Sequence, residues 1–182
     1  MTFMEFIQKH SVSVGTITVV TDGIRKNNNL LVAVISPLEH VNAHFFPFDG
    51  GDPAQTEKFT GLSEESYNDL LAKYPTTTDT LQNYIKSFDV MLGYNSKFLK
   101  RFVDVPNFVD VGTIGQVEWS IAEGTDNPAS AIRSRATIAE ISNPPISWKR
   151  LQEQYPLHTE RIDQEPEWMI NHLRLHKIAL NM

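Results

Sequence analysis

The sequence predicts an α/β fold built on a mixed β-sheet, and two observations carry this prediction. Residues 12–20 and 30–36 are β-branched runs separated by RKNNN, a turn sequence typical of a β-hairpin. Further along the chain, apolar residues at helical spacing alternate with short apolar runs, an order that favours parallel strands joined by helices. We therefore expect antiparallel strands early in the chain and parallel strands later.

The elements that follow the hairpin are predicted from local patterns. A third strand is expected at residues 43–46, before the loop DGGDP at 49–53 interrupts regular structure. Apolar positions over 67–74 have helical spacing, and Ser63 is placed to cap that helix. A second helix is expected over 81–88, after the capping threonines of TTTD.

The second half of the chain continues this alternation. DVML at 89–92 indicates a buried strand, Asn95 is placed to cap a helix, and 107–111 indicates another strand. Ser147 is placed to cap a short helix, and we assign no function to residues 112–146. The remaining helical patterns lie at 114–121, 129–138, 148–155 and 168–180.

The composition is that of a globular protein. The 182 residues suit one domain spanning 1–182, with 41% apolar and 21% charged residues and no run of ~20 apolar residues that would cross a membrane. The first residues carry an acid instead of the positive charge of an export signal, so we expect a cytoplasmic protein. Cysteine is absent, which excludes disulfides and thiolate zinc sites. His172 and His176 form a helical pair, but they lack the acid of a His-Glu-x-x-His motif and are a weak metal candidate.

Three segments carry a resemblance to a known family. FTGLSEESYNDL is similar to a Thr-Gly-Ile-Thr segment after a third strand, VMLGYNSKFLKRFV to a Gly-His-Asn-x-x-Phe-Asp motif, and ISWKRLQEQYPLHTERIDQEPEW to a helix and loop ending in His-x-x-x-x-Asp. In this order they resemble the DEDD (DnaQ-like) family of 3′–5′ exonucleases. The resemblance implies an RNase H-like mixed β-sheet flanked by helices, in an exonuclease-like domain.

The resemblance also implies a metal-dependent chemistry. In this family four carboxylates surround two divalent cations that lower the pKa of the attacking water, and a histidine or tyrosine acts as the base. The first motif is Asp-x-Glu at the end of the first strand, where this chain has VVTDGI. If Thr21 and Gly23 occupy the two positions, both ligands are absent and Asp22 points to the opposite face. If Asp22 is the first ligand, Ile24 replaces the second, so either register loses the glutamate.

The other motifs are also incomplete. Leu99 stands where the family has an aspartate, and its spacing with neighbouring phenylalanines predicts packing in the core. The last motif is retained as His158 and Asp163, which have the family spacing. Asp163 has a second interpretation as the N-cap of the final helix, because it precedes Pro166. With one retained carboxylate we expect no two-metal site, and we interpret His158, Asp163 and Asp22 as relics of catalytic residues.

We therefore expect a pseudoenzyme, a catalytically degenerate 3′–5′ exonuclease-like domain that binds protein or nucleic acid without a metal or cofactor. Lys97, Lys100 and Arg101, beside the second motif, are the candidate nucleic-acid contacts. The formal charge of −6 works against non-specific nucleic-acid binding, so a protein partner is favoured over nucleic acid. No membrane partner is expected.

An active enzyme is the alternative that the residues leave open. It would be a Mg²⁺- or Mn²⁺-dependent 3′–5′ exonuclease that hydrolyses DNA or RNA with an atypical carboxylate set. Its residues would be Asp22, His158 and Asp163 with a further carboxylate, Asp104 or Asp110. The two hypotheses differ in whether these carboxylates converge in the fold.

Overall fold

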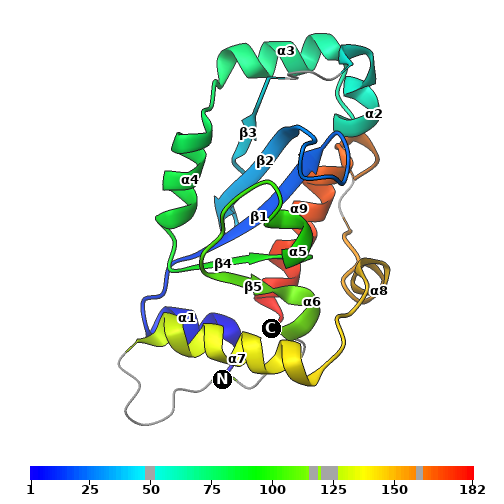
Figure 1. Cartoon of the computed structure of the whole chain (residues 1–182). Coiled ribbons are helices and arrows are strands. Elements are labelled where there is room, and N and C mark those ends of the chain that lie inside the picture. Colours follow the sequence, from blue (N-terminus) through cyan, green and yellow to red (C-terminus); the bar gives the residue numbers. More distant parts are fainter. Residues whose placement is uncertain (48–51, 115–118, 120–126, 159–161) are drawn as a thin grey trace.

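The computed structural model describes residues 1–47, 52–114, 119, 127–158 and 162–182, and it shows an α/β fold around a five-stranded sheet (Figure 1). The strands are β1 (Val14–Thr21), β2 (Leu30–Pro37), β3 (Ala43–Phe45), β4 (Val90–Gly93) and β5 (Phe108–Asp110). Their order across the sheet is β3-β2-β1-β4-β5.

The sheet is mixed, as the sequence predicts. β1 and β2 form the expected antiparallel hairpin, with Ile17 opposite Ile35, and β3 adds antiparallel to β2. β4 pairs in parallel with β1, and β5 pairs in parallel with β4. β3 lies at one edge, where Phe45 forms a parallel bridge to Pro75. This bridge shields part of the edge from pairing with another chain.

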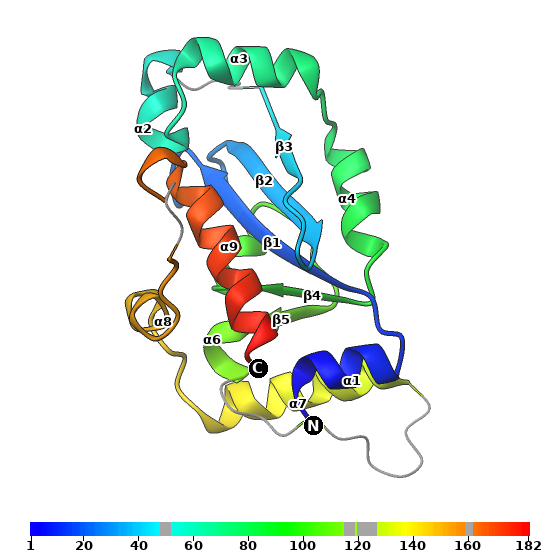
Figure 2. The same cartoon turned by 180° about the vertical axis from the view of Figure 1, so that it is seen from behind.

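Helices cover both faces of the sheet. α4 (Thr78–Lys86) packs Leu81 and Ile85 against Ile17 and Ile35 of one face. α9 (Glu167–Leu180) crosses the opposite face along β1, and α1 (Phe3–Lys9) and α7 (Pro128–Ser142) lie near the carboxyl-terminal end of α9 (Figure 2). No helix in the described part of the chain is long and apolar enough to cross a bilayer. The helices are α1 (Phe3–Lys9), α2 (Thr56–Thr60), α3 (Glu64–Lys73), α4 (Thr78–Lys86), α5 (Ser96–Leu99), α6 (Val111–Ile114), α7 (Pro128–Ser142), α8 (Trp148–Gln154) and α9 (Glu167–Leu180), with 3₁₀ turns η1 (Pro53–Gln55) and η2 (Ile162–Gln164).

Side-chain caps start several helices where the sequence predicts them. Ser63, Asn95 and Ser147 each accept a hydrogen bond from the backbone N–H three residues later. Thr77, the middle threonine of TTTD, does the same for α4. These caps satisfy N–H groups that have no partner within the helix, so a local signal determines where the helix begins.

Several helix starts differ from expectation, and α2 lies where no helix was predicted. α1 was not predicted, although Thr2 and Glu5 form a capping box whose pattern is present in the sequence. α9 begins at Glu167 with Pro166 as its N-cap and no side-chain cap bond, so the interpretation of Asp163 as the N-cap is wrong. Proline is tolerated there because the first N–H groups of a helix have no intrahelical partner. Asp163 lies earlier, in η2.

Two expectations fall largely on residues that the structure does not describe. Of the helical pattern at 114–121, Ile114 ends α6 and Trp119 is buried, and the other residues lie outside the described ranges. Residues 49, 50 and 51 of the DGGDP loop lie outside them as well.

The phenol of Tyr67 joins α3 to the sheet. Tyr67 is 1% exposed, and its hydroxyl donates a hydrogen bond to the carbonyl of Leu31 at 2.9 Å and also contacts the carbonyl of Phe46. Burial raises the pKa of Tyr67 to about 12, so the hydroxyl keeps its proton and remains a donor.

Replacing Tyr67 with phenylalanine removes a buried donor from two carbonyls. We expect Tyr67→Phe to lower the free energy of unfolding by about 1 to 2 kcal/mol. Tyr74→Phe is the matched control, because Tyr74 is 50% exposed, and it should leave stability unchanged. Chemical denaturation followed by circular dichroism measures both variants, and equal effects would contradict the role given to Tyr67.

Candidate functional site

The candidate site lies where β1 extends past the end of β4. β4 pairs only with residues 14–16, so residues 17–21 of β1 have no strand on that side. Side chains of α5 and α9 flank this part of β1 and line the same cavity as Thr18. In open α/β sheets, ligands bind at the carboxyl ends of parallel strands, and the site has this position.

The turn after β4 presents α5 to the site. A Cβ atom on Gly93 would lie 2.7 Å from Cε2 of Phe108 and 3.1 Å from Cγ2 of Ile17, so glycine is required where the neighbouring strands approach. Asn95 follows with a φ of 63°, in the left-handed region that asparagine tolerates, and it caps α5. The GYN sequence thus has a structural explanation that does not depend on catalysis.

Two adjoining cavities form a groove along this part of β1, termed the β1 groove. Their volumes are about 160 Å³ and about 300 Å³, and they share Thr18, Val19, Phe98 and Asn171. The first is also lined by Ile17, Tyr94, Leu99, Trp148 and Leu175. The second is also lined by Val20, Thr21, Lys58, Phe59, Thr60, Gly61, Glu167 and Trp168.

Aromatic side chains form one wall of the β1 groove. The rings of Tyr94 and Trp148 have centroids 5.0 Å apart, and Nε1 of Trp148 donates a hydrogen bond to Oδ1 of Asn171 at 3.3 Å. The Tyr94 hydroxyl donates to the carbonyl of Ile146 at 2.9 Å. Burial, and then the charge of Asp110, raises the pKa of Tyr94, so this phenol stays neutral. The wall is therefore fixed, apolar and suited to stacking.

The β1 groove does not offer the ligands of a two-metal centre. Mg²⁺ and Mn²⁺ are held chiefly by carboxylates in such sites, whereas the first cavity is lined by apolar, aromatic, hydroxyl and amide groups. Glu167 is the one carboxylate among the described residues that line the second. Among all described residues, no group of three or more His, Cys, Asp or Glu side chains could hold a metal ion. Stacking, apolar contact and hydrogen bonding are the chemistry that the groove supports.

Leu99 is a core residue, as its spacing predicts. Its side chain is 3% exposed and packs in the cluster that contains Met91, Val103 and Val105. The same side chain lines the first cavity of the β1 groove. Hydrocarbon thus occupies the position at which the resembled motif has a carboxylate, and the predicted core packing is confirmed.

The three residues interpreted as catalytic relics do not meet in the β1 groove. Asp22 lies in the β1–β2 turn, where its carboxylate accepts hydrogen bonds from the backbone N–H of Asn29 at 2.6 Å and from its side-chain amide at 2.8 Å. His158 is exposed in the loop after α8, and Asp163 is exposed in η2. None of the three lines either cavity.

The further carboxylates of the active-enzyme alternative also lie outside the groove lining. Asp104 is exposed after α5. The carboxylate of Asp110 accepts hydrogen bonds from the backbone N–H groups of Ser96 at 3.0 Å and Gly112 at 2.9 Å. Asp110 therefore ties the start of α5 to the start of α6, which is a structural task.

Basic side chains gather beside the groove. The three cations predicted to contact nucleic acid are exposed on α5 and in the turn that follows it. Nη1 of Arg101 donates a hydrogen bond to the carbonyl of Ile24 at 2.6 Å, and this bond holds the β1–β2 turn beside α5. The turn adds two more exposed cations to the first three. The resulting basic cluster comprises Arg25, Lys26, Lys97, Lys100 and Arg101.

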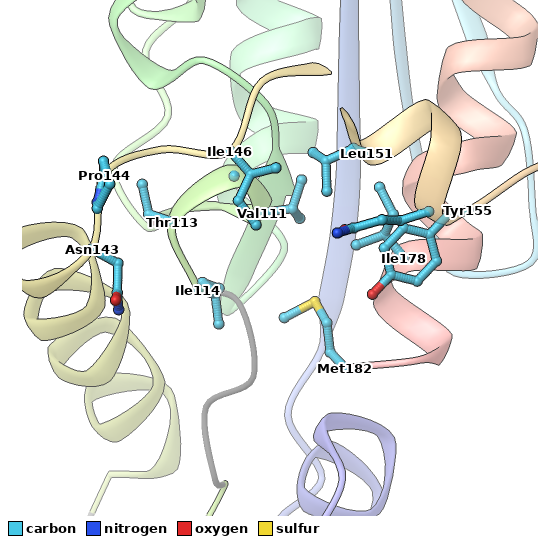
Figure 3. Close-up of a pocket in the computed structure, with 12 residues that line it drawn as sticks. Val111, Thr113, Ile114, Asn143, Pro144, Ile146, Leu151, Tyr155, Ile178 and Met182 are labelled. Atoms are coloured by element: carbon cyan, nitrogen blue, oxygen red, sulfur yellow. The ribbon is translucent and has the colours of Figure 1, made fainter. Parts of the chain in front are cut away.

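A separate cavity of about 650 Å³ lies between α6, α8 and the end of α9 (Figure 3). Leu151, Tyr155 and Ile178 lie on one side of it, and Val111 and Ile146 lie on the other. The described residues that line this cavity are mainly apolar and include no charged side chain. Among the described residues that line it, the phenol of Tyr155 is the one titratable side chain.

The α9 side of the β1 groove is what sequence reasoning missed. No motif singles out Asn171, which belongs to the site only because α9 docks beside β1. Tyr94 belongs to the second motif and Trp148 to the predicted helix at 148–155, but nothing in the sequence indicates that their rings meet. Comparison with known proteins adds no assignment, since no protein-family model and no curated protein matches this chain.

An acid at position 99 tests whether the site is closed. We expect Leu99→Asp to lower the free energy of unfolding by roughly 1 to 4 kcal/mol, because it buries an unpaired charge and removes apolar contact. Lys97→Asp places an acid on the exposed face of the same helix and should change stability by less than about 0.5 kcal/mol. Thermal unfolding with and without Mg²⁺ measures both. A neutral Leu99→Asp variant, or one rescued by Mg²⁺, would show that the pocket is open and polar.

Proposed function

We propose that this chain has an RNase H-like, exonuclease-like fold that has lost its metal site and binds single-stranded nucleic acid without hydrolysing it. The topology supports the fold part of this proposal. An antiparallel hairpin and a third strand precede two parallel strands joined through helices. The GYNSKFL segment follows the carboxyl end of β4, and α9 lies beside β1 next to it.

The observation that carries the functional part is the chemistry of the β1 groove. The first strand, the second motif and the final helix meet there, where the family chemistry requires carboxylates. They contribute Thr18, Leu99 and Asn171, none of which is an acid. A first cavity without charged side chains at this position supports binding in place of metal-assisted hydrolysis.

Stacking groups next to cations favour nucleic acid over a protein partner. Phe98 lines both cavities, Phe59 lines the second, and α5 carries Phe98 together with Lys97 of the basic cluster. Single-strand binding combines stacking of bases on aromatic rings with a positive track for the backbone. The preference for a protein partner rested on the net charge of −6, which does not describe a local cluster of five cations.

The proposal predicts no nuclease activity. With Mg²⁺ or Mn²⁺ in excess, the purified protein should not shorten single-stranded DNA or RNA, because the groove lacks the ligands for two metals. Gel analysis of 3′-end integrity over hours is the measurement. Processive loss of 3′ nucleotides that Asp163→Ala abolishes would instead establish the metal-dependent alternative.

The proposal also predicts salt-dependent binding of oligonucleotides. At low salt we expect roughly micromolar affinity for short single strands, falling with salt as bound phosphates release counterions. Lys97→Glu/Lys100→Glu should weaken binding at least about tenfold and flatten the salt dependence. Fluorescence anisotropy with labelled oligonucleotides measures both quantities.

The control for this experiment makes the same charge change elsewhere. Lys9 of α1 and Lys86 of α4 are exposed and lie outside the basic cluster. Lys9→Glu/Lys86→Glu should therefore keep most of the affinity. If both double variants lose affinity equally, or if no oligonucleotide binds, the basic cluster is not a nucleic-acid site and a protein partner becomes the better hypothesis.

A further inference from the structure

α9 is held on the sheet by a closed group of histidines and hydroxyls. His172 is fully buried and His176 is 6% exposed. Nδ1 of His172 lies 3.0 Å from Oγ1 of Thr18, and its Nε2 lies 2.7 Å from Oγ of Ser36. Nε2 of His176 lies 2.7 Å from Oγ1 of Thr16, which is also 3.1 Å from Nε2 of His172. The pair that the sequence marks as a weak metal candidate is thus engaged with β1 and β2.

The hydrogen bonds of this group are satisfied with both rings neutral. The Ser36 hydroxyl donates to a backbone carbonyl of the β2–β3 turn at 2.7 Å, so its oxygen accepts from Nε2–H of His172. The Thr18 hydroxyl then donates to Nδ1 of His172. The remaining hydroxyl, on Thr16, donates to the carbonyl of Ser36 at 3.3 Å, so its oxygen accepts from Nε2–H of His176. This assignment uses one donor and one acceptor of the His172 ring, the full capacity of a neutral imidazole.

Nothing described around the pair would balance a positive charge. The two ring centroids are 4.6 Å apart. β1 and β2 present hydroxyls to them, and the buried side chains of α1, α6 and β4 carry no charge. Among the described residues, the further titratable group that acts on the pair is His40, which would add positive charge. Burial, and then His176, lowers the pKa of His172 to about 3, while burial, and then His40, lowers that of His176 to about 4.

We propose that His172 and His176 form an acid-sensitive latch, in which protonation of the pair releases α9 from the sheet. α9 also contributes Asn171 and Trp168 to the β1 groove, so release would take the groove apart. This second consequence rests on the proposed function, whereas the release of α9 does not.

The direction of the effect follows from proton binding. Histidines on a released α9 take up protons near their ordinary pKa of about 6.5, whereas the docked helix binds the same protons only near pH 3 to 4. α9 is therefore docked most firmly above about pH 6.5. Below this pH, the equilibrium constant for docking falls by up to about tenfold per histidine for each pH unit. α4, on the opposite face, lacks such a pair and should stay docked over this range.

Hydrogen exchange read out for each helix tests the latch without any ligand. Between pH 7 and pH 5, after correction for intrinsic exchange, protection of α9 amides should fall at least about tenfold while that of α4 is retained. Parallel loss of protection in α4 and α9 would mean global acid unfolding and would overturn the proposal. Oligonucleotide binding at both pH values then reports separately on the groove.

Variants assign the effect to the two rings. His172→Gln and His176→Gln each remove one of the protons that are taken up when α9 is released, so each should reduce the pH dependence of α9 protection. His158→Gln changes an exposed loop histidine and should leave this pH dependence unaltered. Unchanged pH dependence in both core variants would refute the latch. If a core variant does not fold, NMR titration of the two rings in the natural protein decides: titration near pH 6.5 with α9 still docked would refute it, and neutral rings down to pH 5 would support it.

Discussion

The position of α9 on β1 is the constraint on which the β1 groove depends, and the histidine–hydroxyl contacts fix that position. Apolar contacts alone would allow the helix to rotate or slide, because the hydrophobic effect has no direction. Two histidines one turn apart that reach alternate residues of one strand permit a single rotation and a single axial position. That position puts Asn171 and Trp168 beside β1.

A mismatch in strand length provides the space that α9 and α5 enclose. β4 stops at Gly93, while β1 continues to Thr21 and remains paired with β2 on its other side. Residues of β1 beyond β4 therefore meet helices and not a strand. The turn that Asn95 and Asp110 stabilise places α5 against this exposed part of the sheet. The groove thus follows from an ordinary feature of parallel pairing.

The neutral lining of the first cavity of the groove has a physical logic. Carboxylates gathered without a cation repel one another and resist burial, so a site that holds no metal is more stable with hydrocarbon and hydroxyl groups. Leu99 and Thr18 provide these groups. The cations of the basic cluster lie on the exposed surface, where they remain solvated. The stacking surface and the cations of the basic cluster therefore lie next to each other, and the cations do not have to be buried.

The sequence by itself determined the α/β class, the hairpin, several helix starts and the packing of Leu99. These depend on β-branched runs, apolar spacing and caps such as Ser63 and Asn95, whose physical effects act within a few residues. Only the tertiary structure decided that Asp22 belongs to a turn, that Asn171 joins β1 and that a helical histidine pair faces three hydroxyls. Each of these placements depends on how separate elements dock, because side chains far apart in the chain meet only after the sheet and its helices have packed.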